Sequence, residues 1–191
     1  MWCIWMNADE AETGFLGWLG DRGDVITSCS DQTTSQRQQP DIKREISLKA
    51  VTLDKTKVVM GQTVYVPIYS HIYHYNSQDQ VMNLSATLSI RNTDLTNSII
   101  ITSVRYYDSD GKLIRQDIKS PVELKPLAST DFFIAADDTS GGSGANFIVE
   151  WVAEKTVYEP VIEAVMISTS SSQGISFVSP AKILKQHRMQ K

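Results

Sequence analysis

The stretch LSATLSIR, residues 84–91, alternates apolar and polar side chains without a break. Successive side chains of a β-strand point to opposite faces of the sheet. The apolar set from Leu84 to Ile90 is therefore expected to face a core, and the intervening polar set to face water. One dry face and one wet face are typical of antiparallel sheets that pack in pairs. The stretch favours a sandwich over a small barrel.

Short runs of β-branched and aromatic residues, each bounded by turn residues, fill the chain from Thr63 onward. Helical periodicity is not sustained there. Many short strands without intervening helices predict an all-β fold, an immunoglobulin-like antiparallel β-sandwich of about 8–9 strands. The expected strands are residues 64–69, 84–91, 99–107, 112–118, 122–124, 131–135, 146–153, 162–168 and 175–178.

Three details refine this prediction. Pro67 lies inside the first run and argues for an edge strand or a bulge, because proline cannot donate to a strand ladder. Residues 108–111 separate two runs at hairpin spacing, with Gly111 expected to supply a positive φ. Trp151 follows Phe147 and Val149 at strand period, so it is expected in the core.

Residues 130–151, TDFFIAADDTSGGSGANFIVEW, place two strand-like runs around a glycine-rich loop. We expect the runs to form a hairpin whose end gathers carboxylates, hydroxyls and a flexible backbone. The loop oxygens suit calcium, but an EF-hand's spaced carboxylates and a phosphate loop's Gly-Lys-Ser/Thr are missing. A structural glycine turn is the simpler interpretation. The candidate ligand-binding residues are Asp137, Asp138, Ser140, Gly141, Gly142, Ser143, Gly144 and Asn146.

The segment SHIYHYN, residues 70–76, holds the metal candidates His71 and His74, and Met82 would suit a soft ion such as copper. Side chains three apart on a strand point to opposite faces. Both imidazoles therefore meet one ion only where the strand ends in a turn or bulge. A surface hairpin end with aromatic packing is the simpler interpretation of the segment.

No catalytic constellation is visible in the remaining polar groups. Asp108 and Asp110 lie close in sequence, as an acid and base pair would, but turn chemistry explains them. A nucleophile elbow is absent from the sequence, so we expect no catalytic residue, no enzymatic activity and no cofactor. A tyrosine-rich set suggests an interaction surface instead, although half-buried strand positions explain it more simply. Its members are Tyr65, Tyr69, Tyr73 and Tyr75.

The net charge of -4 disfavours a nucleic-acid partner, because such a partner requires a basic face. No apolar run approaches the roughly 18 residues of a membrane-spanning helix. Composition divides the chain into an atypical N-terminal segment (1–29), a polar linker (30–45), the β-sandwich domain (46–180) and a basic, solvated C-terminal tail (181–191).

Residues 26–29, Ile-Thr-Ser-Cys, have the form of a bacterial lipobox, which makes Cys29 the candidate lipidation site. The polar residues after it resemble a lipoprotein tether. The acidic start and the charges at 21–24 contradict a signal peptide, which needs a positive start and an apolar run. Two explanations remain open: the match is chance, or the first 25 or so residues are a mis-called or frameshifted start. The tether-like segment favours the second.

Five motifs along the chain occur in the same order as in a known protein family. They are VYVPIYSHIY, LSATLSIRNTD, ITSVRYYDSDGKLIR, LKPLASTDFFIAADDTSGGSGANFIVEW and IEAVMISTSSSQGISFVS. Over residues 64–179 the chain resembles a bacterial family, best represented in cyanobacteria, known as domain of unknown function 3124. The resemblance implies a lipoprotein signal, which members often carry, and so supports the interpretation of Cys29. It implies no activity and no catalytic residues.

Together these observations predict a non-enzymatic, envelope-tethered module that binds a partner protein or a small ligand. The alternative is a periplasmic metal-binding or metal-delivery protein that uses His71 and His74. The expected location is the cell envelope, through a lipid anchor, if Cys29 is processed, and otherwise the soluble cytoplasm. The sequence does not indicate an oligomeric state.

Overall fold

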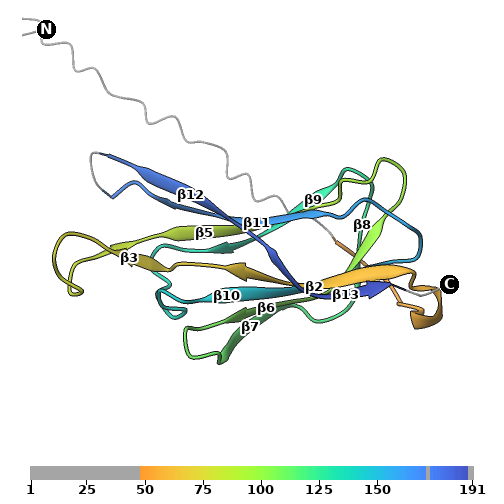
Figure 1. Ribbon diagram of the computed structural model, residues 1–191, viewed down its shortest axis with the longest axis horizontal. Helices are drawn as coiled ribbons and strands as arrows, with labels where there is room; N and C mark the ends of the chain where they lie inside the picture. Colours follow the sequence, from red (N-terminus) through yellow and green to blue (C-terminus); the bar gives the residue numbers. More distant parts are fainter. Residues whose placement is uncertain (1–47, 171–172, 189–191) are drawn as a thin grey trace, which may run out of the picture. The chain divides into compact units, whose positions relative to one another are not determined.

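Thirteen β-strands and one 3-10 turn are the regular elements of residues 48–170 and 173–188, the part of the chain that the structure, a computed structural model, describes (Figure 1). Eleven of them form two antiparallel sheets, and two more form a separate hairpin. The prediction of an all-β antiparallel sandwich is confirmed, whereas the predicted count of about 8–9 strands is too low. Within these residues no helix is long and apolar enough to cross a membrane. Cys29 and the polar linker lie outside the described residues.

The larger sheet has seven strands, and two of its members share one side of β6. The short strand β8 pairs with the first half of β6, and β7 (Leu113–Ile118) pairs with the second half. In spatial order the other strands are β1 (Lys49–Ala50), β8 (Val122–Leu124), β6 (Ile99–Tyr107), β10 (Asn146–Ala153), β2 (Met60–Pro67) and β13 (Lys182–Arg188).

The smaller sheet has four strands, and the expected alternation places one of its faces in the core. Leu84 and Ile90 are fully buried, while Arg91 is exposed. In spatial order the strands are β12 (Ile175–Pro180), β11 (Val161–Ser168), β5 (Ser85–Arg91) and β9 (Ser129–Ile134). A two-stranded hairpin, β3 (His71–Tyr73) with β4 (Val81–Asn83), lies between β2 and β5 in the chain, and a 3-10 turn, η1 (Lys55–Lys57), precedes β2.

One apolar cluster fills the space between the two sheets. Trp151 is its largest fully buried side chain, so the core assignment of this residue is confirmed. Its indole Nε1 donates a hydrogen bond to Gln62 Oε1 at 3.3 Å. This bond links β10 to β2 inside the core, where a polar group needs such a partner.

The predicted hairpin across residues 130–151 is wrong. β9 pairs with β5 in the smaller sheet, whereas β10 lies between β6 and β2 in the larger sheet. The glycine-rich loop therefore crosses from one sheet to the other. Both strands keep the predicted period, but each buries its apolar face by pairing with strands that are distant in sequence.

Two further expectations need correction. Pro67 does not mark an edge strand, because β2 has β10 on one side and β13 on the other. It is tolerated as the last residue of β2, where the β13 ladder has already ended at Tyr65. The C-terminal residues 182–188, interpreted as a solvated tail, form the strand β13. The hairpin at Gly111 is confirmed, with φ of 79° at this glycine.

The ladders define two ends of the domain. β2 runs from Met60, opposite Ala153, to Pro67, opposite Asn146. Beyond Pro67 lie the β3–β4 hairpin and the turn between β11 and β12, which we call the hairpin end (Figure 1). Beyond Met60 lies the β1 end, where the described chain begins.

Candidate functional site

The β3–β4 hairpin projects from the end of the sandwich as a short arm (Figure 1). Its turn is held by a hydrogen bond from His74 N to Gln80 O at 3.0 Å. Tyr75 follows with φ of 56°, which is uncommon for a residue other than glycine. The side chain of Tyr75 is 86% exposed, so this strained position presents an aromatic ring to solvent.

A cavity of about 770 Å³ separates this arm from the turn between β11 and β12. Its wall combines apolar, amide and hydroxyl groups and carries no carboxylate, ammonium or guanidinium group. The lining residues are His74, Tyr75, Val81, Met82, Asn83, Ser170, Gln173, Gly174 and Ile175.

A second cavity of about 520 Å³ adjoins the first, because Asn83 and Ser170 belong to the walls of both. It extends along the start of β5 to Asp137, the single charged residue in its wall. We refer to the two adjoining cavities as the tip groove. The remaining residues of the second cavity are Ser85, Ala136, Ile167, Ser168 and Thr169.

The tyrosine-rich set divides into two pairs. Tyr65 is half-buried in β2, and Tyr69 packs its ring edge against Phe177 with centroids 5.9 Å apart. Tyr73 and Tyr75, by contrast, are 52% and 86% exposed on the arm. Tyr69 is itself 39% exposed, and of the four tyrosines only Tyr75 lines the tip groove.

The three metal candidates are not brought together as one set. Met82 pairs with Ile72, so Met82 and His71 project from opposite faces of the hairpin. The His71 ring contacts Ser70 Oγ through Nδ1 at 3.1 Å. His74 and Met82 do line the same cavity. No group of three or more His, Cys, Asp or Glu suited to a metal occurs in the described part of the chain.

The glycine-rich loop is held by neighbouring turns rather than left free. Ser109 of the β6–β7 hairpin turn donates through N and Oγ to Gly141 O at 2.9 and 3.0 Å, and its Oγ accepts from Gly144 N at 2.9 Å. Ser70 donates through N and Oγ to Gly142 O at 3.2 and 2.9 Å. The loop thereby joins the β6–β7 turn to the base of the arm.

Gly141 is required here because the loop backbone passes over the buried hydroxyl of Tyr106. A Cβ at position 141 would overlap Tyr106 Oη and would lie 2.7 Å from the Ala145 Cβ. The Tyr106 side chain is fully buried, and this burial raises its pKa to about 12, with a smaller contribution from Asp138. The phenol therefore stays protonated under the loop at neutral pH.

The candidate ligand-binding residues of the loop do not gather at one site. Asp137 lines the tip groove, while Asp138 Oδ1 accepts hydrogen bonds from Ser140 N and Oγ at 3.2 and 2.5 Å. Asn146 is the first residue of β10 and pairs with both Pro67 and Tyr107. The glycines and Ser143 lie between these points, and Gly142 has a φ of 73°.

A buried polar hub that the sequence analysis did not single out joins the loops at the β1 end. Asn92 is 2% exposed, and its Nδ2 donates to the carbonyls of Asn97, Leu124 and Lys125 at 2.9, 3.2 and 3.0 Å. Asp94, 5% exposed, accepts through Oδ2 from Tyr158 N at 3.2 Å. The sequence Asn-Thr-Asp could have indicated this hub, because Asn and Asp side chains often hydrogen-bond to the backbone two residues further along the chain.

Asp94 also fixes the loop between β5 and β6. Its Oδ1 accepts from Thr96 N at 2.9 Å and from Asn97 N at 2.7 Å. These two backbone hydrogen bonds, the first the larger cause, lower the pKa of Asp94 from 3.8 to about 2. The carboxylate is therefore ionised throughout the neutral range and can accept both backbone hydrogen bonds.

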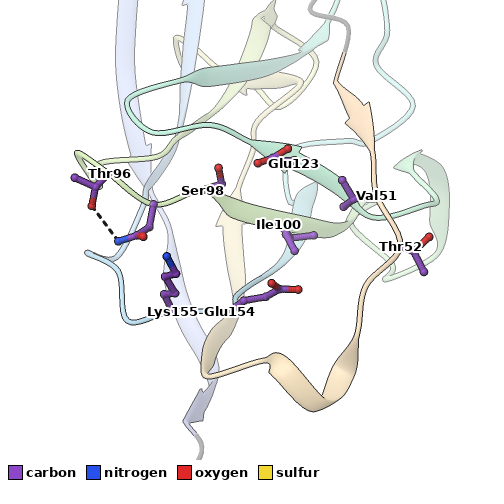
Figure 2. A pocket seen from close by; sticks show the side chains of 9 residues that line it. Val51, Thr52, Thr96, Ser98, Ile100, Glu123, Glu154 and Lys155 are labelled. Atoms are coloured by element: carbon purple, nitrogen blue, oxygen red, sulfur yellow. Dashed lines mark hydrogen bonds between the residues drawn. The ribbon is translucent and has the colours of Figure 1, made fainter.

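This loop forms one wall of a third cavity, of about 390 Å³, on the larger sheet at the β1 end (Figure 2). Its floor includes Ile100 of β6 and Val51, which follows β1. Two carboxylates and one ammonium border it, whereas the tip groove carries the single carboxylate of Asp137. The other lining residues are Thr52, Thr96, Asn97, Ser98, Glu123, Glu154 and Lys155.

Comparison with known proteins places the chain in a family. The family model described as "Protein of unknown function (DUF3124)" matches residues 61–184, more than half of the chain. The chain belongs to the DUF3124 family. In this member the family match begins within β2 and ends within β13, the strand at one edge of the larger sheet.

No curated protein matches this member of the DUF3124 family. Among solved structures, the crystal structure of Thermotoga maritima 1070 is similar at 12% identity and a TM-score of 0.35. That similarity covers 63% of this chain and 92% of the other.

Proposed function

We propose that this DUF3124 protein is a non-enzymatic binding module of the bacterial envelope that holds a segment of a partner protein in the tip groove. One observation carries the proposal: two adjoining cavities share Asn83 and Ser170 and are flanked by the exposed ring of Tyr75. Binding sites are concave, mostly apolar and supplied with a few polar groups. Exposed tyrosines are enriched at protein interfaces because one ring offers both apolar area and a hydroxyl.

The groove chemistry favours an extended, largely uncharged segment. The Asn83 side chain offers both an amide donor and an acceptor to a partner backbone, and hydroxyls extend along the second cavity. Met82 and Ile175 supply apolar contact in the larger cavity. Asp137 at the far end would pair with one basic side chain of the partner.

A metal-delivery function has weaker support. His74 and Met82 share a cavity, but His71 projects from the opposite face of the arm from Met82. Two ligands do not complete the three or four that protein sites for zinc or copper use.

Binding to the groove is tested with peptides selected from a random library on the full chain. We expect a selected peptide to lose about tenfold in affinity, or 1.4 kcal/mol, on Tyr75→Ala and on Met82→Asp, measured by fluorescence anisotropy. Tyr158→Ala is the matched control, since Tyr158 is 71% exposed and lies outside the groove. Failure to enrich any peptide, or an equal loss in the control, would contradict the proposal.

The envelope address rests on Cys29, which would be lipidated and become the new N-terminus. The polar linker of about 15 residues would then connect the lipid to the domain.

Fusing residues 26–191 behind a functional lipoprotein signal tests this address. We expect the product to fractionate with membranes and to take up labelled palmitate, because lipid is added to the thiol of a lipobox cysteine. Cys29→Ser is expected to abolish the uptake. An exported but unlipidated product with Cys29 intact would show that the four-residue match is chance.

A further inference from the structure

The cavity at the β1 end is bordered by charged side chains that form no ion pair with any of the described residues. Glu123, Glu154 and Lys155 border it, and none of them takes part in an ion pair or a side-chain hydrogen bond there. Lys49 lies opposite Glu123 in the β1–β8 ladder, and no ion pair joins these two either. Charges of both signs in one cavity wall are thus available to a ligand.

The two adjacent charges at the end of β10 are turned apart. Figure 2 shows the Lys155 ammonium rising toward the loop that carries Thr96 and Ser98, while the Glu154 carboxylate extends toward the segment after β1. In this view Ile100 lies on the floor between Glu154 and Glu123. The Lys155 ammonium and the Glu154 carboxylate are thus held apart at the edge of an apolar floor, and the Glu123 carboxylate lies nearer Ser98.

The loop that forms the cavity wall beside Lys155 is held in place by hydrogen bonds before any ligand binds. Asp94 Oδ1 accepts from the backbone N–H groups of Thr96 and Asn97, and Asn92 Nδ2 donates to Asn97 O. Preorganised groups lose less conformational entropy when a ligand binds. The cavity volume of about 390 Å³ lies near the lower end of the range for small-molecule sites, so the ligand must be small.

We propose that this cavity binds a small zwitterion with an apolar side chain, a free amino acid or a short peptide. The ligand ammonium would meet Glu154, its carboxylate would meet Lys155, and its side chain would lie on Ile100 and Val51. A simple amine or a simple carboxylic acid would leave one side of the cavity without a charged partner. The site lies at the opposite end of the domain from the tip groove and does not depend on a function there.

Calorimetry on the full chain tests the proposal with L-leucine and dileucine as ligands. We expect binding to weaken about tenfold, or 1.4 kcal/mol, in Glu154→Gln and in Lys155→Gln. Leucine amide, which lacks the carboxylate, should bind the wild-type protein as weakly as leucine binds Lys155→Gln, and should lose nothing further in that variant. Asp131→Asn and Lys112→Gln are controls, since both residues are exposed and lie outside the cavity.

The calorimetry identifies the source of the zwitterion or contradicts the proposal. Tighter binding of leucine would identify a free amino acid as the source of the zwitterion, and tighter binding of dileucine would identify a peptide. No binding by either ligand, unchanged affinity in both cavity variants, or equal affinity for leucine and leucine amide would overturn the proposal.

Discussion

Replacing Trp151 with alanine is expected to destabilise the domain by about 3–5 kcal/mol, the largest effect of any single change considered. The indole is fully buried between the sheets, so its removal exposes no surface that water can reach and leaves a cavity instead. Gln62 would also lose the donor that reaches its Oε1 from Trp151 Nε1. Urea unfolding followed by circular dichroism measures the change in the free energy of unfolding.

Arg91→Ala provides the comparison on a wet face. Arg91 is exposed and contacts Glu163 at 3.9 Å and Ser89 at 3.0 Å, both at the surface. Its replacement should change stability by no more than about 0.5 kcal/mol. Equal shifts of the urea midpoint in the two variants would show that the dry and wet faces have been assigned wrongly.

Gly141→Ala is expected to destabilise the domain by roughly 1–3 kcal/mol, although the substitution adds only one methyl group. The added methyl would overlap the hydroxyl of Tyr106, which is fully buried and has little room to move. Removing that hydroxyl with Tyr106→Phe should recover part of the loss. Recovery should be incomplete, because the Ala145 Cβ and the Tyr106 ring carbon Cζ would each still lie 2.7 Å away.

Gly174→Ala is the matched control, since the nearest atom to its added Cβ would lie 3.5 Å away, an ordinary contact. We expect the free energy of unfolding of this variant to lie within about 0.5 kcal/mol of that of the wild-type protein. A double-mutant cycle by thermal or urea unfolding measures the coupling between positions 141 and 106. Absence of coupling would mean that the loop moves aside and is not packed on the phenol.

The strands that were predictable from sequence are those that bury one face. β5 and β10 alternate because their inner residues meet the core, and both were located closely. β13 escaped prediction because residues 182–187 are all exposed, which leaves no apolar period to detect. Its lysines are typical of a protected sheet edge, and the same lysines made the segment resemble a solvated tail.

Residue type alone identified Tyr75 and Met82 as chemically interesting, but their surroundings depend on tertiary structure. The tip groove exists because the turn after β11 lies beside the arm, a proximity between segments about 90 residues apart in the sequence. The hairpin predicted around the glycine-rich loop failed for a related reason. Sequence neighbours such as β9 and β10 were assumed to pair, whereas each completes a ladder with strands from elsewhere.

The pairing of β13 with β2 has a consequence for how the domain is made. The first long strand of the sheet receives its outer neighbour from residues 182–188, near the end of the chain. During synthesis, the hydrogen-bonding edge of β2 remains open until these residues emerge. A shortened chain that stops at Pro180 would leave the edge of β2 open, and open edges recruit strands from other molecules. In the folded domain β13 takes the edge position, and its lysines make that edge a poorer template for a further strand.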